Sequence, residues 1–437
     1  VYKRQIVVGA GETGAYVASD VIALIDATRD VVVLEDGQFA KLTPAGVEYT
    51  DEAGNVIEPK VTHIDWDLDM AEKGGYPDFM LKEIHEQPRV VRDTLVGRMT
   101  PAGELDIDEL GLSLEELNDI DRVYVIACGT SYHAGLIAKN LIEGWARIPT
   151  EVEAASEFRY RNPIITPTTL VVAVSQSGET ADTLAAIRDA RIKGAKVFGI
   201  TNVVGSPVAR ESDGVIYTKA NKEIAVASTK SFIGQVVSLT LLALLLAQVK
   251  YRLTTKQARM LFRELSDTAE QIQWILDTQT DAVHEAALLC KDAQSALFVG
   301  RGMGAAISYE GALKLKEVSY LHAEAYAAGE MKHGPIALID PGFPVIAVAT
   351  KSATYDKTVS NLMECKARGA KVIVVATEGD GEINKIADCI IRVPAVRDVF
   401  SPITASVPLQ LLAREVAILR GCDVDQPRNL AKSVTVE

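Results

Sequence analysis

The segment VVAVSQSGETADTL, residues 171–184, passes from an apolar run through a hydroxyl-rich turn into a stretch of helical periodicity. The turn carries the hydroxyls of Ser175, Ser177 and Thr180 around Gly178. A single hydroxyl is enough to cap a helix. Several hydroxyls beside the N–H groups and the positive dipole end of a helix suit a phosphate dianion. The sequence therefore predicts a strand, a phosphate-binding turn and a helix in succession.

An internal repeat surrounds this segment and indicates the fold class. The tetrapeptide GAKV occurs at 194–197 and again at 369–372, and helical patterns separate the apolar runs in both copies. Alternating strands and helices favour parallel sheets with right-handed crossovers and ligands at the carboxyl ends of the strands. We therefore expect an α/β protein with two tandem domains, each a parallel sheet flanked by helices in a three-layer sandwich. The expected strands are 123–127, 170–174, 197–200 and 215–217 in the first copy, and 296–299, 345–349, 372–376 and 390–393 in the second.

Composition narrows the classes of partner. The chain has 437 residues, 48% hydrophobic and 24% charged, which predicts two or three globular domains. Its net charge of −14, without a basic stripe, argues against nucleic acid and anionic membranes as partners. The five cysteines are scattered without a CxxC pair, which predicts free thiols in a reducing, cytoplasmic compartment and no metal site. The uncharged run 231–249 has the length of a membrane span, but its position inside the repeat favours a buried crossover helix.

The N-terminal stretch GAGETG, residues 9–14, imitates a dinucleotide-binding fingerprint. The residues that follow, 30–54, show hairpin patterning with turn glycines and not another strand–helix unit. We therefore expect no nucleotide cofactor. The chain begins at Val1 with neither an initiator Met nor an apolar signal segment, which we interpret as a truncated edge.

Residues 61–117 read as a connector that contains a solvated helix. Its histidines, His63 and His85, are assigned to that solvated surface. The alternating aspartates within 65–69 are interpreted as a surface charge run, because no further ligands follow at a fixed spacing.

The second copy carries a different chemical cluster. Glu310, Lys314 and Glu317 fall on one face of a helix expected over 305–322. A surface salt-bridge ladder is one interpretation. The helix is rich in Ala, Leu and Val, however, so we favour a polar cavity in which a carboxylate beside a lysine transfers a proton. His333, flanked by turn residues, is the candidate general acid or base.

Two further side chains are candidates for the site. Lys432 lies in a proline-stiffened tail and is suited to form a Schiff base with a carbonyl. Cys128 follows a predicted strand, and we assign it to the pocket wall and not to a nucleophile, because the nearby His133 lies on the following helix.

The most specific feature of the chain is a set of six segments: CGTSYHAG (128–135), ASEFRYR (155–161), SQSGETADTL (175–184), VASTKSF (226–232), EGALKLKEVSYLHAEAYAAGEMKHGP (310–335) and DQPRNLAKSVTVE (425–437). Together these segments resemble the isomerising glutamine–fructose-6-phosphate aminotransferases, the glucosamine-6-phosphate synthases, over the sugar-isomerising half of that family. The repeat then corresponds to two sugar-isomerase (SIS) domains. Residues 6–60 resemble the last part of the family's glutaminase domain.

The resemblance implies a domain plan and a pocket. The plan comprises a remnant of a glutaminase (type 2 amidotransferase) domain at 1–60, a linker at 61–117, SIS domain 1 at 118–255, a helical connector at 256–289, SIS domain 2 at 290–422, and a C-terminal tail at 423–437 that closes the sugar site. The sugar phosphate would be held by Ser131, Ser175, Gln176, Ser177 and Thr180. The pocket would be lined by Cys128, Gly129, Thr130, Val226 and Ser228.

The resemblance also implies a reaction. Lys432 would form an imine with C2 of open-chain fructose 6-phosphate. Glu317, with Lys314 beside it, would move a proton between C1 and C2, and His333 of a neighbouring subunit in a homodimer would assist ring opening. Fructose 6-phosphate and glutamine-derived ammonia would yield glucosamine 6-phosphate without a cofactor.

One departure from the family bears on this expectation. The family's glutaminase uses an N-terminal cysteine nucleophile that this chain lacks, so we expect sugar-phosphate binding and isomerisation without glutamine hydrolysis. Two alternatives stay open. A non-catalytic SIS sugar-phosphate sensor would need neither Glu317 nor Lys432, and a fructosamine-phosphate deglycase would share the phosphate turn.

Overall fold

The computed structural model describes residues 6–11, 14–18, 24, 27–43, 46–63, 73–107 and 110–435. The chain divides into two compact units, Val1–Gly75 and Tyr76–Glu437. The boundary lies inside the segment expected as a linker, and residues 76–117 belong to the larger unit.

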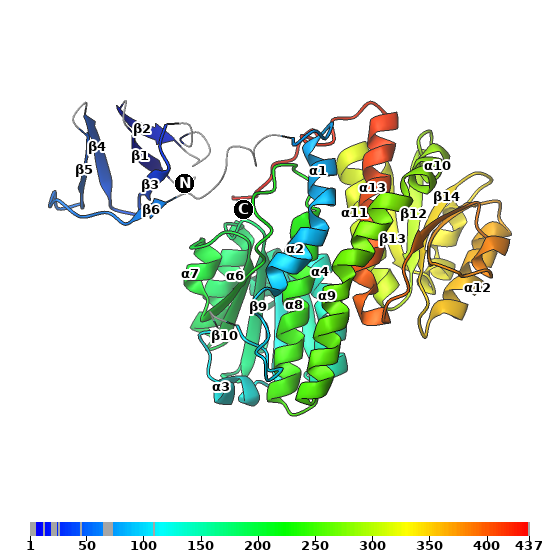
Figure 1. Ribbon diagram of the computed structural model, residues 1–437, viewed down its shortest axis with the longest axis horizontal. Coiled ribbons are helices and arrows are strands. Elements are labelled where there is room, and N and C mark those ends of the chain that lie inside the picture. The colour runs from blue at the N-terminus through cyan, green and yellow to red at the C-terminus, as the bar shows by residue number, and fades with distance from the viewer. Residues whose placement is uncertain are drawn as a thin grey trace. The chain divides into compact units, whose positions relative to one another are not determined.

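The smaller unit consists of antiparallel strands (Figure 1). Gly11 of β1 lies opposite Gly14 of β2, so the next described element after β1 is a strand and not a helix. A dinucleotide fingerprint requires a helix N-terminus at this point. The hairpin predicted within residues 30–54 is confirmed, because β4 and β5 form an antiparallel pair. The sheet order is β2-β1-β3-β6, and β4 pairs with β5. The strands are β1 (Val7–Gly11), β2 (Gly14–Ala18), β3 (Asp30–Val33), β4 (Phe39–Thr43), β5 (Gly46–Thr50) and β6 (Val61–His63).

The larger unit contains two five-stranded sheets with the same topology. Their orders are β11-β10-β9-β7-β8 and β13-β12-β14-β15-β16, and every neighbouring pair is parallel. The strands are β7 (Arg122–Ala127), β8 (Thr150–Ala154), β9 (Thr169–Ser175), β10 (Lys196–Thr201), β11 (Gly214–Tyr217), β12 (Ser295–Gly300), β13 (His322–Ala327), β14 (Pro344–Ala349), β15 (Lys371–Thr377) and β16 (Cys389–Val393). The predicted repeat is confirmed. In each sheet the order reverses between the first and third strands, where open α/β sheets bind ligands.

Each sheet has an edge strand that the sequence pattern did not reveal. β8 reads TEVEA and β13 reads HAEAYA, and both pair with the first strand of their sheet. Polar residues interrupt both segments, with two glutamates in β8 and a histidine and a glutamate in β13, because an edge strand is only half covered. These segments therefore lack the continuous apolar run that marked the central strands.

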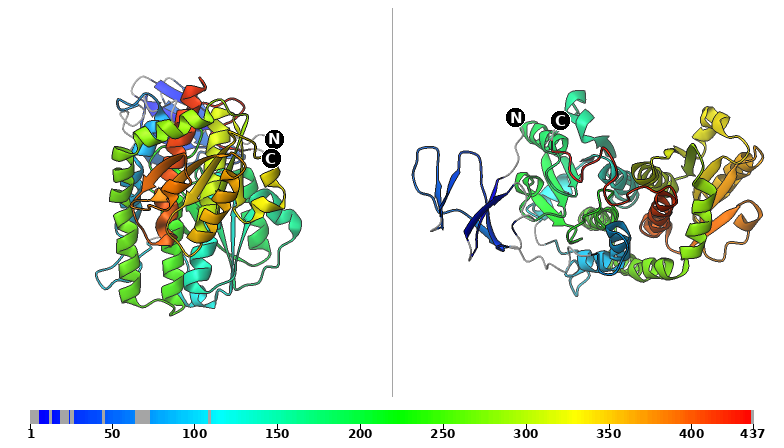
Figure 2. Two further views of the ribbon diagram at one scale, coloured as in Figure 1. Left: turned by 90° about the vertical axis from the view of Figure 1, so that its right-hand side faces the viewer. Right: turned by 90° about the horizontal axis from the view of Figure 1, so that it is seen from above.

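Helices cover both faces of each sheet, which gives the expected three layers (Figures 1 and 2). α6 and α7 lie on the outer face of the first sheet and α12 lies on the outer face of the second, whereas α4, α8, α11 and α13 lie between the sheets. The helices are α3 (Leu114–Asp119), α4 (Thr130–Leu141), η3 (Ile142–Ala146), α5 (Ala155–Arg161), α6 (Ala181–Ile192), α7 (Pro207–Glu211), α8 (Lys230–Val249), α9 (Thr255–Thr278), α10 (Thr280–Cys290), α11 (Met303–Ser319), η4 (Glu330–His333), η5 (Pro335–Leu338), α12 (Tyr355–Lys366), η6 (Ile383–Lys385), η7 (Asp398–Phe400) and α13 (Ser401–Leu419). The inner helices share one continuous apolar core with both sheets.

The connector is not a solvated helix, and that prediction is wrong. It forms α1 (Phe79–His85) and α2 (Gln87–Leu95), which bury Met80, Ile84 and Val91 completely. The spacing of these three side chains places them on one face of a helical segment. The larger unit therefore begins with α1, which lies against α13.

Two helical segments, Lys230–Val249 and Asp398–Leu419, are long and apolar enough to cross a membrane. In the first, 89% of the most apolar window is buried inside the protein, and in the second 72% is buried. Burial of this extent is typical of core helices, as predicted for the uncharged run.

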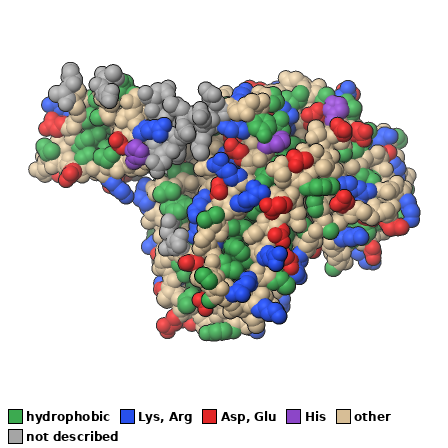
Figure 3. All heavy atoms as spheres, viewed as in Figure 1, with side chains coloured by type: hydrophobic (Ala, Val, Ile, Leu, Met, Phe, Trp, Pro, Cys, Tyr) green, Lys and Arg blue, Asp and Glu red, His purple; other side chains and the backbone are tan. Residues whose placement is uncertain are grey.

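On the face drawn in Figure 3, basic and acidic side chains are interspersed over the described residues.

Candidate active site

The phosphate turn lies at the carboxyl end of β9, beside the point where the strand order reverses. Ser175 is buried, and its Oγ accepts a hydrogen bond from the Gly178 amide (3.0 Å) and lies 3.0 Å from Thr180 Oγ1. Ser177 Oγ accepts from the Glu179 amide (3.2 Å). Gly178 has φ +68°, and a Cβ there would lie 2.1 Å from Ser206 Oγ. Only glycine therefore fits this turn.

The loop after β7 lies next to this turn, because β7 and β9 are neighbouring parallel strands with Ala127 opposite Val174. Ser131 is buried in the first turn of α4, and its hydroxyl accepts a hydrogen bond from Gln235 Nε2 at 2.9 Å. Gln235 was not among the predicted site residues. Its only signal in the sequence is that it is a polar amide within the largely apolar run that forms α8.

Cys128 is partly buried, and burial raises the pKa of its thiol. A raised pKa disfavours the thiolate, so Cys128 is suited to the pocket wall and not to nucleophilic attack. His133 is directed elsewhere, since its Nδ1 lies 2.7 Å from Glu310 Oε2. The five cysteines are free.

The stripe on α11 is buried, which excludes the surface salt-bridge ladder. The side chains of Glu310 and Lys314 are 2% and 1% exposed. Lys314 Nζ donates to Glu317 Oε2 (2.5 Å) and lies 3.6 Å from Glu310 Oε1. Burial alone would lower the pKa of Lys314, but the charges of Glu317 and Glu310 outweigh burial and raise that pKa.

Glu310 also joins the two SIS-type domains. Its Oε1 accepts a hydrogen bond from Thr130 Oγ1 (3.1 Å), and its Oε2 faces His133, so both contacts are with the start of α4. The sequence placed Glu310 on the same face as Lys314 but gave it no role in the pocket. The structure shows that it connects the α11 stripe to the first turn of α4, which also carries Ser131.

The C-terminal tail lies along the segment that precedes α8. Lys432 Nζ donates to Glu223 Oε2 (2.5 Å) and to the carbonyl of Ala225 (2.8 Å), and the Val226 amide donates to the carbonyl of Asp425 (2.9 Å). Further along the tail, the carbonyl of Val434 accepts from the amide of Ala181, the first residue of α6 (3.3 Å). The tail thus reaches from Lys432 to the phosphate turn.

Glu223 is a site residue that the sequence analysis missed. Its side chain is fully buried, and it accepts hydrogen bonds from Lys432, from Ser228 Oγ (3.2 Å), and from the amides of Thr229 (2.9 Å) and Ser231 (3.0 Å). A lone glutamate in a loop gives little local signal. Its one signal in the sequence is that it lies a few residues before the predicted pocket residues Val226 and Ser228. The structure therefore brings Lys432 and Ser228 together on one carboxylate.

His333 is the one predicted catalytic residue that lies apart from this cluster. It is exposed in η4. Within the described part of the chain it forms no hydrogen bond to Glu317 or Lys432.

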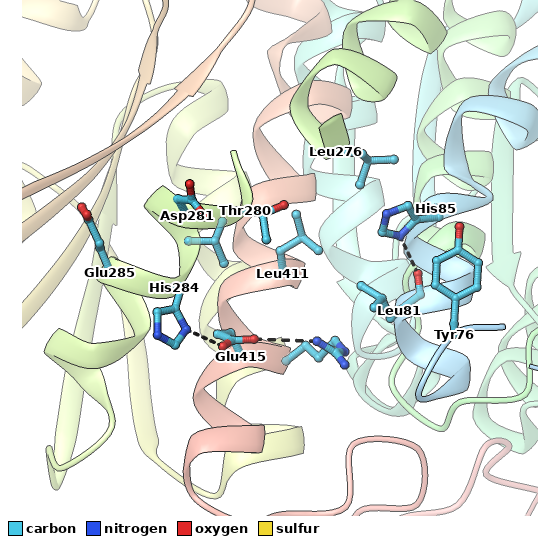
Figure 4. A pocket seen from close by; sticks show the side chains of 12 residues that line it. Tyr76, Leu81, His85, Leu276, Thr280, Asp281, His284, Glu285, Leu411 and Glu415 are labelled. Atoms are coloured by element: carbon cyan, nitrogen blue, oxygen red, sulfur yellow. Dashed lines mark hydrogen bonds and ion pairs between the residues drawn. The ribbon is translucent and has the colours of Figure 1, made fainter. Parts of the chain in front are cut away.

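A cavity of ≈ 590 Å³ lies elsewhere in the larger unit, between α1, α10 and α13 (Figure 4). None of the predicted site residues lines it. His284 Nδ1 lies 2.7 Å from Glu415 Oε1, and His85 Nδ1 lies 2.9 Å from the Leu81 carbonyl. Among the residues that the structure describes, no group of three or more His, Cys, Asp or Glu side chains is arranged to hold a metal ion.

Comparisons with known proteins agree with this geometry. The SIS domain family model matches residues 116–245 and 289–420. The glutamine–fructose-6-phosphate aminotransferases [isomerizing] of Clostridium acetobutylicum and Symbiobacterium thermophilum are 48% and 51% identical over 432 and 433 residues, which is 99% of this chain and 71% of each relative.

Solved structures give the same result. The C-terminal domain of glucosamine-fructose-6-phosphate aminotransferase from Francisella tularensis superposes with a TM-score of 0.77 at 40% identity, and the match covers 82% of this chain and 99% of that one. Glucosamine-6-phosphate deaminase from Thermotoga maritima superposes with a TM-score of 0.63 at 26% identity, with 82% and 99% of the two chains covered.

Proposed function

This chain belongs to the isomerising glutamine–fructose-6-phosphate aminotransferases, whose sugar-isomerising half it carries, and we propose that the cluster described above is its sugar site. The phosphate of fructose 6-phosphate binds at the reversal point of the first sheet. Rotatable hydroxyls and the N-terminus of α6 supply hydrogen bonds and partial positive charge there. The residues that hold the phosphate are Ser131, Ser175, Gln176, Ser177 and Thr180, and Cys128, Gly129, Thr130, Val226 and Ser228 line the pocket.

The reaction proceeds through an imine. The amine of Lys432 attacks C2 of the open-chain ketose, and water leaves. Ammonia then adds to C2 of this imine and displaces the Lys432 amine, which leaves an unsubstituted imine at C2. Glu317 takes a proton from C1 of that imine and returns it to C2, which gives glucosamine 6-phosphate in its aldehyde form. Lys314 holds the Glu317 carboxylate in position, because its Nζ donates a 2.5 Å hydrogen bond to Glu317 Oε2.

Ring opening requires a further acid or base, and we assign it to His333 of a partner subunit. The exposure of His333 in this chain supports that assignment, since an exposed imidazole is available to a second copy. The homodimer, the product and the cytoplasmic location are parts of the same proposal.

The observation that carries the proposal is the position of Lys432. It lies on the segment that contains Val226 and Ser228, and its tail reaches the phosphate turn through Val434. A sugar-phosphate sensor would not need a partly buried, carboxylate-bound lysine in its pocket.

Borohydride trapping tests the proposal. Incubation with fructose 6-phosphate and borohydride is expected to give an adduct, seen by mass spectrometry, that Lys432→Ala abolishes. Lys385→Ala is the matched control, because Lys385 is 70% exposed and pairs only with Glu382 among the described residues. If calorimetry shows sugar-phosphate binding while wild-type protein gives no adduct, the imine mechanism is wrong and the sensor alternative is favoured.

A further inference from the structure

Close to Glu223 lies a second buried carboxyl that the proposed mechanism does not use. Glu83, on α1, is 2% exposed, and its Oε1 accepts a hydrogen bond from the amide of Ile224. Its Oε2 is buried without a hydrogen-bond partner. Ile224 adjoins Glu223, and the Glu83 carboxyl interacts electrostatically with both Glu223 and Lys432.

The two carboxyls have different protonation states. Burial, and then the negative charge of Glu223, raises the pKa of Glu83 to about 8, against the opposing charges of Lys432 and Lys230. Burial would also raise the pKa of Glu223, but the charge of Lys432 and the hydrogen bonds to Glu223 outweigh it and lower that pKa. At neutral pH, Glu83 is therefore the neutral acid and Glu223 the carboxylate.

Other charged groups surround this pair. Lys230 of α8 is paired with Glu86, the residue between α1 and α2, with Nζ and Oε2 2.6 Å apart. Lys314 of α11 is paired with Glu317, and the charge of Glu223 contributes to its raised pKa. The cation that Glu223 itself binds is that of Lys432, with Nζ and Oε2 2.5 Å apart.

The tail is attached to the helix that carries Glu83. The carboxylate of Asp425 accepts hydrogen bonds from the amides of Phe79 (3.0 Å) and Met80 (2.9 Å), the first two residues of α1. Glu83, Glu223 and Lys432 thus belong to one packed assembly.

We propose that Glu223 is a catalytic residue that takes the ammonium proton of Lys432, and that Glu83 is a positioning residue that keeps the carboxyl pair singly charged. This inference rests on the proposed imine mechanism. Glu223 receives the proton, and the neutral amine attacks C2. A proton moves from the new N–H to the former carbonyl oxygen. Glu223 then returns its proton to that hydroxyl, water leaves, and the iminium cation faces the regenerated carboxylate.

Glu83 acts by its neutrality. If Glu83 ionises, two negative charges surround Lys432 and hold its proton more tightly, so capture of the ketose slows. Glu83→Gln keeps an acceptor for the Ile224 amide and removes the ionisation. The ratio of capture rates, Glu83→Gln over wild type, should therefore rise as pH passes through about 8.

The test measures the rate of borohydride-trapped adduct formation, with fructose 6-phosphate affinity and unfolding temperature measured in parallel. Glu223→Gln should slow capture about 100-fold or more, the usual loss for a missing proton acceptor, and change the dissociation constant less than about threefold. Glu223→Asp should recover part of the rate. Glu382→Gln, an exposed site, is the matched control.

The outcomes separate the two proposals. No adduct in the wild type overturns the imine mechanism itself. An adduct that Lys432→Ala abolishes, but that Glu223→Gln forms at the wild-type rate, overturns only the role of Glu223. If Glu223→Gln unfolds, the Glu83→Gln series decides, because a rate ratio that is the same at pH 7 and pH 9 contradicts the inference.

Discussion

Lys314 is enclosed by two carboxylates inside an otherwise apolar helix. Buried ion pairs contribute little net stability relative to apolar side chains, but removal of one partner leaves an uncompensated charge. The residues of this site are therefore mutually dependent, and single substitutions should affect folding as well as catalysis.

Lys314→Met is expected to lower the free energy of unfolding by about 3–5 kcal/mol, because Glu310 and Glu317 lose their cation in a buried environment. Urea unfolding measures this loss. Lys385→Met, at an exposed ion pair, should change it by less than about 0.5 kcal/mol. Equal losses in the two variants would show that the Lys314 cluster is solvated.

Glu83 predicts a pH dependence of stability. Its folded-state pKa, about 8, is above the usual carboxyl value, so the folded state binds more protons than the unfolded state between these two values. The stabilising effect of that proton is complete at low pH and is lost as pH rises through about 8. Glu83→Gln lacks this loss. Its unfolding temperature relative to wild type should increase from pH 5 to pH 8 and then level off, and a constant difference would contradict the assignment.

At the scale of elements, the phosphate turn depends on a backbone that only glycine permits. Gly178 and Gly194 both have left-handed φ values, +68° and +93°, but a Cβ at Gly194 would meet no atom within 4 Å. The two positions therefore share the conformational strain and differ in the contact with Ser206.

Gly178→Ala should weaken fructose 6-phosphate binding at least tenfold, because the turn must move away from Ser206. Gly194→Ala is the matched control and should lose only about 1 kcal/mol of stability from strain. Calorimetric titration and thermal unfolding distinguish the two effects. If Gly178→Ala binds fructose 6-phosphate with wild-type affinity, the turn is not the phosphate site.

Over the whole molecule, the tail, α1 and the segment before α8 converge although they are far apart in the sequence. Asp425 makes the link, since its carboxylate caps α1 and its carbonyl accepts from Val226. Long-range contacts of this kind position Lys432 and are formed only in the folded state.

Asp425→Ala should therefore slow borohydride capture at Lys432 while fructose 6-phosphate still binds, because the phosphate turn is unchanged. Loss of the cap is expected to cost about 1 kcal/mol. The tail should also be cleaved faster in limited proteolysis. Asp267→Ala, at an exposed position on α9, is the control, and equal cleavage of the two variants would contradict the link.

The local sequence pattern was sufficient to predict four features: the central strands, the glycine-dependent turn, the buried helix α8 and the polar face of α11. Each of these depends on side chains close in sequence, and their periodicity reports burial directly. The edge strands β8 and β13 were missed because half-covered strands need no continuous apolar run.

The sequence by itself determined which segments become strands, helices and turns, and which polar residues lie on one helix face, because these properties follow from local periodicity. Only the tertiary structure decided that Lys432 meets Glu223, 209 positions away, and that Glu83 of α1 binds the amide of the neighbouring Ile224. A carboxyl acquires a raised or lowered pKa from the groups packed around it. Which groups those are depends on how the elements pack, and no local pattern encodes that.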